Sequence, residues 1–275
     1  MPFSDHCPLL ATDTASANAL IDQAVALTRA KKARYLELRT GPSSVLANRR
    51  DLVEAPLYVR WLTSLAPKTD AVWSALKSPV QRQIKKARKL GVRVRVAERR
   101  EDMRTYYQLH LQTRCRKHGM PAQPLRYFNA LWDHFAENGA LWLLLAEVED
   151  QVVAGMVLMC AGDTMHYAYG ASDERYLHLS PNNLLMWEAM TLGCTQGYTQ
   201  FDLGRTATAN EGLMGFKRGW GGEAVPLPYY YYPQPAGLAA TSESSQKFKV
   251  LTACWRRLPL PIAASLGGHL YKHLG

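Results

Sequence analysis

Apolar and polar positions along the first third of the chain repeat with periods that predict both helices and strands. Residues 14–31 place apolar side chains every three or four positions, which predicts a helix capped by Thr14 or Ser16. Farther on, the pattern changes from that helical period to alternation and then to an irregular, proline-containing stretch. We therefore predict two strands and a connector, at residues 34–39, 57–62 and 66–80.

From residue 81 onward the pattern predicts a longer succession of elements. The predicted helices are residues 81–91, 101–117, 124–137 and about fifteen residues from Pro181. The predicted strands are residues 92–96, 141–147, 152–160, 166–171, 199–203 and 225–232. From residue 92 this order resembles that of an N-acetyltransferase (GNAT) domain, in which two splayed central strands open a cleft for an acyl donor.

The predicted fold class is therefore α/β, a GNAT-like (acyl-CoA N-acyltransferase) fold with one complete GNAT domain preceded by a partial one. The first domain is short, as if its early strands were absent. We expect four regions: a partial first domain, a connecting basic helix, the complete domain and a C-terminal tail helix, at residues 1–66, 67–91, 92–235 and 236–275.

Charge narrows the range of partners. The formal net charge of +10 in 275 residues favours an anionic partner, such as nucleic acid, a phosphorylated precursor or an anionic surface. The five cysteines are scattered and odd in number, which makes a metal or disulfide framework an unfavourable interpretation. We therefore expect no bound metal or cofactor. We also expect no transmembrane segment and no signal peptide, because the apolar runs are too short for either.

Several short motifs follow one another in an order that resembles one family. They are IKKARKLGV at 84–92, YGASDE at 169–174, the start of a helix at Pro181-Asn182-Asn183, FDLGR at 201–205 and GLMGFKRGWG at 212–221. The set is similar to the Fem peptidyl transferases (FemA, FemB and FemX) and their BioF2-like acetyltransferase relatives, over residues 15–235. The resemblance implies transfer of an aminoacyl group from aminoacyl-tRNA onto an amine of a peptidoglycan precursor.

The chain departs from the resemblance in ways that leave the acyl donor open. The helical arm of FemA, a candidate tRNA contact, has no counterpart. The loop in which GNAT enzymes bind pyrophosphate normally carries glycines, whereas residues 171–183 contain none and include Tyr176 and Leu177. Aminoacyl-tRNA and an acyl thioester, on coenzyme A or an acyl carrier protein, both remain open as donors.

The strand at 199–203 and the residues after it carry the catalytic candidates. Asp202 at the strand end could act as a general base, or it could pair with Arg205. Lys217 matches the lysine of the family's Phe-Lys motif and could stabilise a developing negative charge, or it could be a solvated surface lysine. We expect Arg205 to bind a phosphate or carboxylate of the substrate. The helix start at Asn182 and Asn183 could attract an anion, or it could be only a capped helix end.

Two further groups could line a substrate groove. Tyr106, His110 and Arg114 recur every four residues on one helix face. Tyr167 and Tyr169 alternate on one strand and could point into the cleft. The alternative is that the single histidine is structural. We predict substrate contacts for all five, with the three helix residues lining an acceptor groove.

A basic stripe covers the predicted helix at 81–91. Arg82, Lys85, Lys86 and Lys89 fall on one face and could bind tRNA, a nucleotide-linked precursor or anionic lipid. The alternative is a solvated helix between domains. The tail could rest on a membrane surface, although packing against the main domain is the favoured interpretation.

These features together predict a cytoplasmic acyl- or aminoacyltransferase, with peripheral contact to the inner face of the membrane left open. Its acceptor would be an amine or hydroxyl of a cell-envelope glycan or peptidoglycan precursor. Attack would be direct, without a covalent enzyme intermediate. The alternatives are an acyl-CoA-dependent N-acetyltransferase and a non-catalytic RNA- or envelope-binding module that has kept a GNAT shell.

Overall fold

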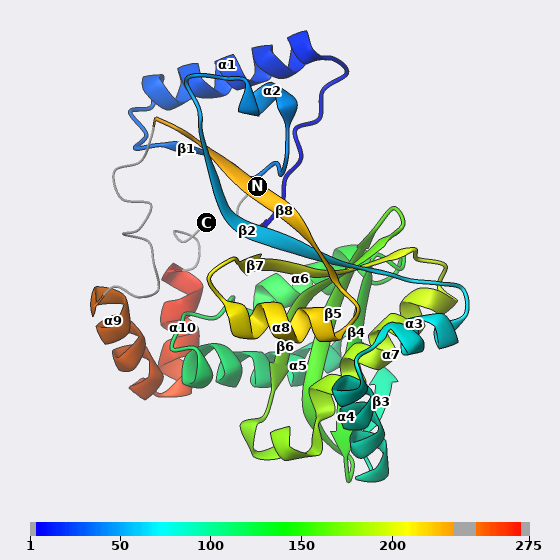
Figure 1. The fold of residues 1–275 in the computed structure, drawn as a ribbon. Helices are drawn as coiled ribbons and strands as arrows, with labels where there is room; N and C mark the ends of the chain where they lie inside the picture. The colour runs from blue at the N-terminus through cyan, green and yellow to red at the C-terminus, as the bar shows by residue number, and fades with distance from the viewer. Residues whose placement is uncertain (1–3, 234–245, 271–275) are drawn as a thin grey trace. The chain divides into compact units, whose positions relative to one another are not determined.

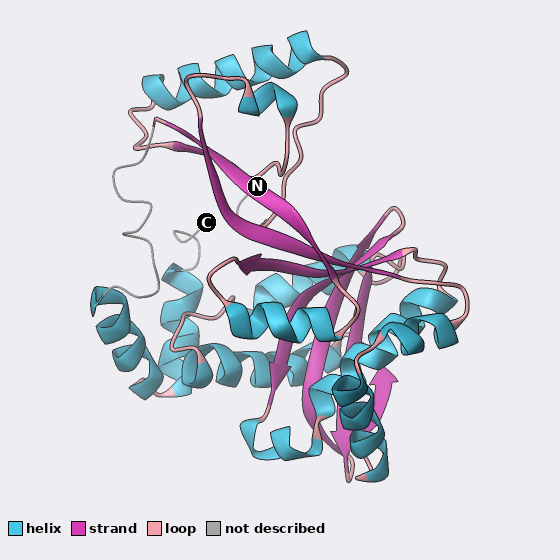
Figure 2. Ribbon diagram, in the orientation of Figure 1, coloured by secondary structure: helices cyan, strands magenta, loops and turns pink. Residues whose placement is uncertain are grey.

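The computed structural model describes residues 4–233 and 246–270 as a mixed α/β chain (Figures 1 and 2). The chain folds into two compact units, and each unit is built from segments that are separate in the sequence. Among the described residues, the first unit contains 4–61, Gly204–Phe216 and 223–233. The second contains Leu62–Leu203, Lys217–Gly222 and 246–270.

The first unit is a small sheet with helical cover. Its elements are α1 (Thr14–Ala30), β1 (Leu36–Leu38), α2 (Ser44–Ala47), most of β2 (Val53–Ser64) and β8 (Glu223–Tyr232). β8 lies between β1 and β2, and it pairs antiparallel with β1 so that Leu36 faces Tyr232. Ile21 and Val25 of α1 and Leu46 of α2 form one buried apolar cluster with Leu52 and with Tyr230 of β8.

The cap of α1 differs from the sequence-based prediction. Asp13, rather than Thr14 or Ser16, is the N-cap residue, and its carboxylate accepts a 2.7 Å hydrogen bond from the backbone N–H of Ser16. An aspartate at this position satisfies a helix N–H group and complements the positive end of the helix dipole. The predicted start of the helix at residue 14 is therefore correct, and the prediction was wrong only about which residue caps it.

The second unit carries the larger set of elements. Its helices are α3 (Thr69–Ala75), α4 (Ser78–Lys89), α5 (Glu101–Gln112), α6 (Leu125–Phe135), α7 (Pro181–Thr195), α9 (Gln246–Arg257) and α10 (Leu260–Leu270). A π-helical turn, Thr113–Lys117, extends α5, and a 3-10 helix, Glu174–Leu179, precedes α7. Its strands are β3 (Arg93–Val96), β4 (Leu141–Val148), β5 (Gln151–Ala161), β6 (Thr164–Ser172) and the start of β7 (Gln200–Ala207).

Strands of the second unit lie in the order β7-β6-β5-β4-β3, antiparallel except for the parallel pair β6–β7. Helices cover both faces. On one face Tyr106 of α5 packs so closely on Gly155 of β5 that a Cβ there would lie 2.7 Å from its ring. On the other face Gly193 of α7 adjoins Met165 of β6. This arrangement of strands and helices confirms the predicted α/β, GNAT-like fold class.

Two segments predicted to be irregular are helical. The connector at residues 66–80 contains α3 and the start of α4, since Pro79 occupies the first turn, where a missing N–H costs nothing. The segment after Arg205, where no helix or strand was predicted, forms α8 (Glu211–Gly219). Three glycines lower the helix propensity of α8, which explains why its sequence pattern indicated a turn.

The tail contributes to the core of the second unit. The predicted tail helix is two helices, α9 and α10, and Trp255 and Ala263 are buried in the cluster around α5 and α6. Residues 234–245, which include the start of the predicted tail region, lie outside the described residues. The four regions proposed from the sequence are consecutive stretches of the chain, whereas the compact units are interleaved. As evolutionary domains, those four regions stay a prediction.

Candidate active site

Strands β6 and β7 pair over a short distance and then part. Their register joins Thr164 to Gln200, Met165 to Phe201 and His166 to Asp202, whereas β6 itself continues to Ser172. Gly204 has φ +75°, a backbone conformation that glycine adopts without the penalty of a Cβ. In the register of β6 and β7, His166 and Asp202 are the last residues that lie opposite each other before the strands separate.

His166 and Asp202 approach each other closely at this point. The distance from His166 Nδ1 to Asp202 Oδ2 is 3.0 Å, and the aspartate side chain is 7% exposed whereas the histidine side chain is 36% exposed. His166 Nδ1 is buried and is not aligned for a hydrogen bond in this conformation. The two side chains are therefore within hydrogen-bond distance, although the ring is not oriented to make the bond in this conformation.

The strand register places this pair on a defined face of the sheet. Leu141 is opposite Met159, and Met159 is opposite His166, so that a row of four residues crosses β4, β5, β6 and β7 to Asp202. Leu141 and Met159 belong to the apolar cluster beneath α5 and α6. The imidazole therefore lies beside an apolar floor, which strengthens electrostatic interactions near it.

Lys217 lies in the last turn of α8 and is 6% exposed. This burial excludes the alternative of a solvated surface lysine. Its backbone carbonyl accepts a hydrogen bond from the N–H of Trp220, which is fully buried. A cation in the last helical turn is favoured by the helix dipole. The catalytic role of Lys217 stays a prediction.

Arg205 is held by residues of the first unit. Its guanidinium lies 3.2 Å from Asp5 Oδ1, donates a 2.9 Å hydrogen bond to the hydroxyl of Tyr229 and stacks 4.3 Å from the centroid of Tyr58. These contacts give the arginine a structural role in the first unit. Its binding of substrate stays a prediction.

Tyr106 and His110 are buried side chains of α5. The Tyr106 hydroxyl lies 3.5 Å from His110 Nδ1, and His110 Nε2 lies 2.9 Å from Gln123 Oε1. Burial lowers the pKa of His110 to about 4, so the ring is neutral at pH 7. Burial also raises the pKa of Tyr106 well above its ordinary value. Arg114, in the π-helical turn, donates to the carbonyl of Pro121.

This cluster is part of the core, because Tyr106 and His110 are 0% and 2% exposed and pack on Phe128. In this conformation neither side chain faces solvent. The structural alternative for His110 thus has direct support from its contacts. Acceptor binding by Tyr106, His110 and Arg114 stays a prediction.

Tyr167 and Tyr169 make different contacts. The Tyr169 hydroxyl is 2.7 Å from that of Tyr127. Tyr167 folds along its own strand, so that a Cβ on Gly170 would lie 1.8 Å from the Tyr167 hydroxyl. A register shift in β5 between Val157 and Leu158 interrupts the regular alternation that the sequence suggested. Burial raises the pKa of Tyr167 to about 12, which keeps its hydroxyl protonated.

The helix start at α7 is ordered by its own side chains. Ser180 adopts φ +60° before the first helical residue, Pro181, and Asn182 donates a 3.2 Å hydrogen bond to the hydroxyl of Ser172. The backbone N–H of Asn183 donates to the carbonyl of Ser180. In place of the glycine loop, Asp173 pairs with Arg175 and begins the 3-10 helix. Substrate contacts of Asn182 and Asn183 stay predictions.

The basic stripe on α4 is exposed, as the spacing implies. Arg82, Lys85, Lys86 and Lys89 are exposed, whereas Ile84 and Ala87 are buried. Arg88, beside the stripe, forms an ion pair with Glu188 of α7 at 2.8 Å. Lys85 lies 5.8 Å from the ring centroid of Trp73. The exposure fits both anion binding and simple solvation.

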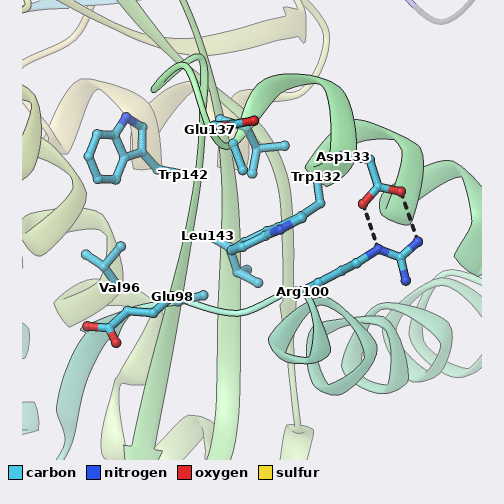
Figure 3. A pocket seen from close by; sticks show the side chains of 11 residues that line it. Val96, Glu98, Arg100, Trp132, Asp133, Glu137, Trp142 and Leu143 are labelled. Atoms are coloured by element: carbon cyan, nitrogen blue, oxygen red, sulfur yellow. Dashed lines mark hydrogen bonds and ion pairs between the residues drawn. The ribbon is translucent and has the colours of Figure 1, made fainter.

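A separate cavity of about 430 Å³ lies between β4, the end of β3 and α6 (Figure 3). Trp132 and Leu143 form part of its wall, and Glu98 and Glu137 add carboxylates. Arg100 and Asp133 close one side with two hydrogen bonds of 2.6 and 2.9 Å. The cavity was not foreseen from the sequence, because it depends on how α6 meets the sheet edge.

Sequence reasoning missed His166. A single histidine in an alternating strand gives no signal of its own. The predicted strand at 166–171 and the strand ending at Asp202 would have suggested the pair only if their parallel register had been known. Within the described residues there is no group of three or more side chains suited to a metal ion, and no helix is long and apolar enough to span a membrane.

Comparison with known proteins agrees with this fold. The model of the acetyltransferase (GNAT) domain family matches residues 74–218. The chain is 35% identical over 82 residues to a lipid II:glycine glycyltransferase of Staphylococcus epidermidis, a match that covers 28% of this chain and 20% of that protein. The match to the Staphylococcus aureus protein of the same name is 32% over 75 residues, with 25% and 18% covered. The chain thus covers about a fifth of these relatives.

Two solved structures share the fold over most of the chain. FemX superimposes with a TM-score of 0.63 at 17% identity, covering 84% of this chain and 80% of its own. The C-terminal domain of a putative lysylphosphatidylglycerol synthetase from Agrobacterium fabrum gives 0.64 at 16% identity, with 83% and 76% covered. The resemblance to Fem proteins noted in the sequence is confirmed by the glycyltransferase match and this shared fold.

Proposed function

Because the chain belongs to the acetyltransferase (GNAT) domain family, we propose that it transfers an activated aminoacyl or acyl group onto an amine of a cell-envelope precursor. The carrying observation is the position of Asp202 and His166, where the parallel strands β6 and β7 part inside the family-matched segment. The local identity to lipid II:glycine glycyltransferases supports a peptidoglycan precursor such as lipid II as acceptor.

The proposed chemistry needs three physical contributions. The donor carbonyl must be held close to the acceptor amine, which removes most of the entropic cost of their encounter. A base must take the amine proton, and a fixed positive charge must face the oxygen that becomes negative. Buried Lys217 is the proposed source of that charge, because a cation acts most strongly where water is excluded.

A donor screen with the full chain tests this proposal. Purified protein is incubated with lipid II and one of three donor classes: charged tRNAs, acyl-CoAs or thioesters of acyl carrier protein. Mass spectrometry then measures addition to the acceptor. We expect an added aminoacyl or acyl group with at least one donor class. Unchanged acceptor with every donor, beside a FemX-type positive control, would contradict the proposal.

A second candidate is a non-catalytic module that binds polyanions. The exposed stripe on α4 is the observation that favours it. This candidate predicts salt-sensitive binding to tRNA without any turnover in the same screen. The two outcomes are distinguishable because the screen reports a covalent product and a binding assay does not.

A further inference from the structure

The side chains of His166 and Asp202 are buried to different extents, and this difference indicates which of them can take a proton from a substrate. The Asp202 carboxylate is buried, whereas about a third of the His166 side chain is exposed at 36%. His166 Nδ1 is itself buried and faces the carboxylate. Because Nδ1 is buried, it contributes nothing to the exposed part of the side chain, and Nε2 is the ring nitrogen left to meet solvent.

We infer that His166, rather than Asp202, accepts the proton of the attacking group, and that Asp202 is the positioning residue that holds the imidazole. The inference rests on the proposed function. A carboxylate opposite Nδ1 favours the tautomer with the proton on Nδ1, and that tautomer leaves the Nε2 lone pair free to accept a proton. A buried carboxylate is poorly placed to meet an acceptor that arrives from solvent.

Atoms and charge are conserved in the proposed transfer. The acceptor nitrogen attacks the donor carbonyl carbon, a C–N bond forms and the carbonyl oxygen becomes negative. Nε2 of His166 takes one proton from the new ammonium. The tetrahedral intermediate collapses, the bond from carbon to the donor oxygen or sulfur breaks, and the leaving atom receives that proton from the imidazolium. Asp202 stays ionised throughout and stabilises the transient imidazolium.

The chain offers an internal control for the accessibility of Nε2. Diethyl pyrocarbonate acylates neutral, accessible imidazoles, and peptide mass spectrometry locates the product. His110 is neutral at pH 7 but is only 2% exposed, with Nε2 held against Gln123. We expect modification at His166 while His110 remains unmodified. An unreactive His166 in the folded protein would overturn the inference, whether or not a donor has been found.

Kinetics test the role itself, with glycyl-tRNA and lipid II or the pair that the donor screen identifies. His166→Ala is expected to lower kcat by about 100- to 10,000-fold, and free imidazole should restore part of it. Asp202→Asn should lower kcat with little change in KM. The double variant should be no slower than His166→Ala, because the residues act as one unit.

Circular dichroism and His166→Gln, which keeps polar contacts, guard against simple unfolding. Wild-type turnover in His166→Ala would overturn the inference and leave the proposed function intact. A loss that imidazole does not restore, with additive losses in the double variant, would assign His166 a structural role. Failure of the wild type to transfer any group would instead contradict the proposed function, and the labelling result would still decide whether Nε2 is accessible.

Discussion

Two histidines in the second unit occupy opposite environments. His110 is enclosed by α5, Phe128 and Gln123, and burial lowers its pKa to about 4. His166 lies where β6 and β7 part, with one nitrogen against a buried carboxylate and the rest of its ring partly exposed. The same side chain is thus fixed as a neutral core group in one place and left in contact with solvent in the other. Burial and partners, rather than residue type, indicate which one handles protons.

After the His166 variants, the largest expected effect concerns the buried cation of Lys217, the proposed source of positive charge. Lys217→Met keeps much of the side-chain volume and removes the cation, so turnover should fall by about 100- to 1000-fold. The thermal midpoint should change little, because methionine keeps the stem length and much of the packing of the lysine side chain. The measurement is kcat beside thermal unfolding.

The neighbouring Arg218 is exposed, and Arg218→Met is the matched control, with near wild-type turnover expected. Equal turnover in Lys217→Met and wild type would show that burial of a cation in this unit does not imply catalysis. The comparison between buried core groups and groups that take part in catalysis would then depend on His110 and His166 alone.

The next effect tests whether His110 is a neutral core group. Its folded pKa of about 4 lies below the ordinary value of 6.5, so the unfolded state binds the proton more readily. The associated stability is complete above pH 6.5 and is lost as the pH falls toward 4. The loss should reach about 3 kcal/mol of unfolding free energy. Urea unfolding of wild type and His110→Gln between pH 7 and 4 measures it, and parallel curves for the two proteins would refute the assignment.

A smaller effect tests the packing of the tyrosines near that core. Gly170→Ala would place a Cβ 1.8 Å from the Tyr167 hydroxyl, so the ring must move. We expect a loss of about 1–3 kcal/mol in unfolding free energy. Gly215→Ala, at a helical position with open space around the added carbon, is the control and should stabilise by up to about 1 kcal/mol. If both variants unfolded alike, Tyr167 would not be held as described.

The smallest effect extends the comparison to fully exposed charge. Changing Lys85, Lys86 and Lys89 to Glu should weaken binding of bulk tRNA about tenfold at low salt, with a smaller difference at high salt. Folding should be unaffected, since these side chains face solvent. Reversal of exposed Lys31 and Arg34 in the first unit is the control. Identical tRNA affinity in stripe and control variants would assign the stripe to solvation.

The sequence allowed the order of strands and helices to be predicted because each element carries a clear period. The predicted strand at 166–171 and the helix beginning at Pro181 agree with β6 and α7 to within a few residues. Local pattern failed at α8, where glycines at 212, 215 and 219 mimic a turn, and at α3. In both segments tertiary packing outweighs weak local propensity.

The candidate site was less accessible to prediction. Asp202 and Lys217 were identified as candidates from short motifs, but the local sequence pattern did not predict that both side chains are buried. His166 was overlooked because its meaning depends on a parallel register with Asp202 that local pattern does not specify. Conversely, the helical spacing of Tyr106 and His110 correctly put them on one face, and only the packing shows that this face is enclosed.

Because the two units are interleaved in the sequence, neither can be separated from the other by a single cut in the gene. Because α8 begins in the first unit and ends in the second, and β7 crosses in the opposite direction, no single uninterrupted stretch of the gene encodes either unit. A recombination event or an expression clone that cuts once within this region would separate strands from their hydrogen-bonded neighbours. Neither unit can therefore be transferred to another protein as one continuous segment of sequence.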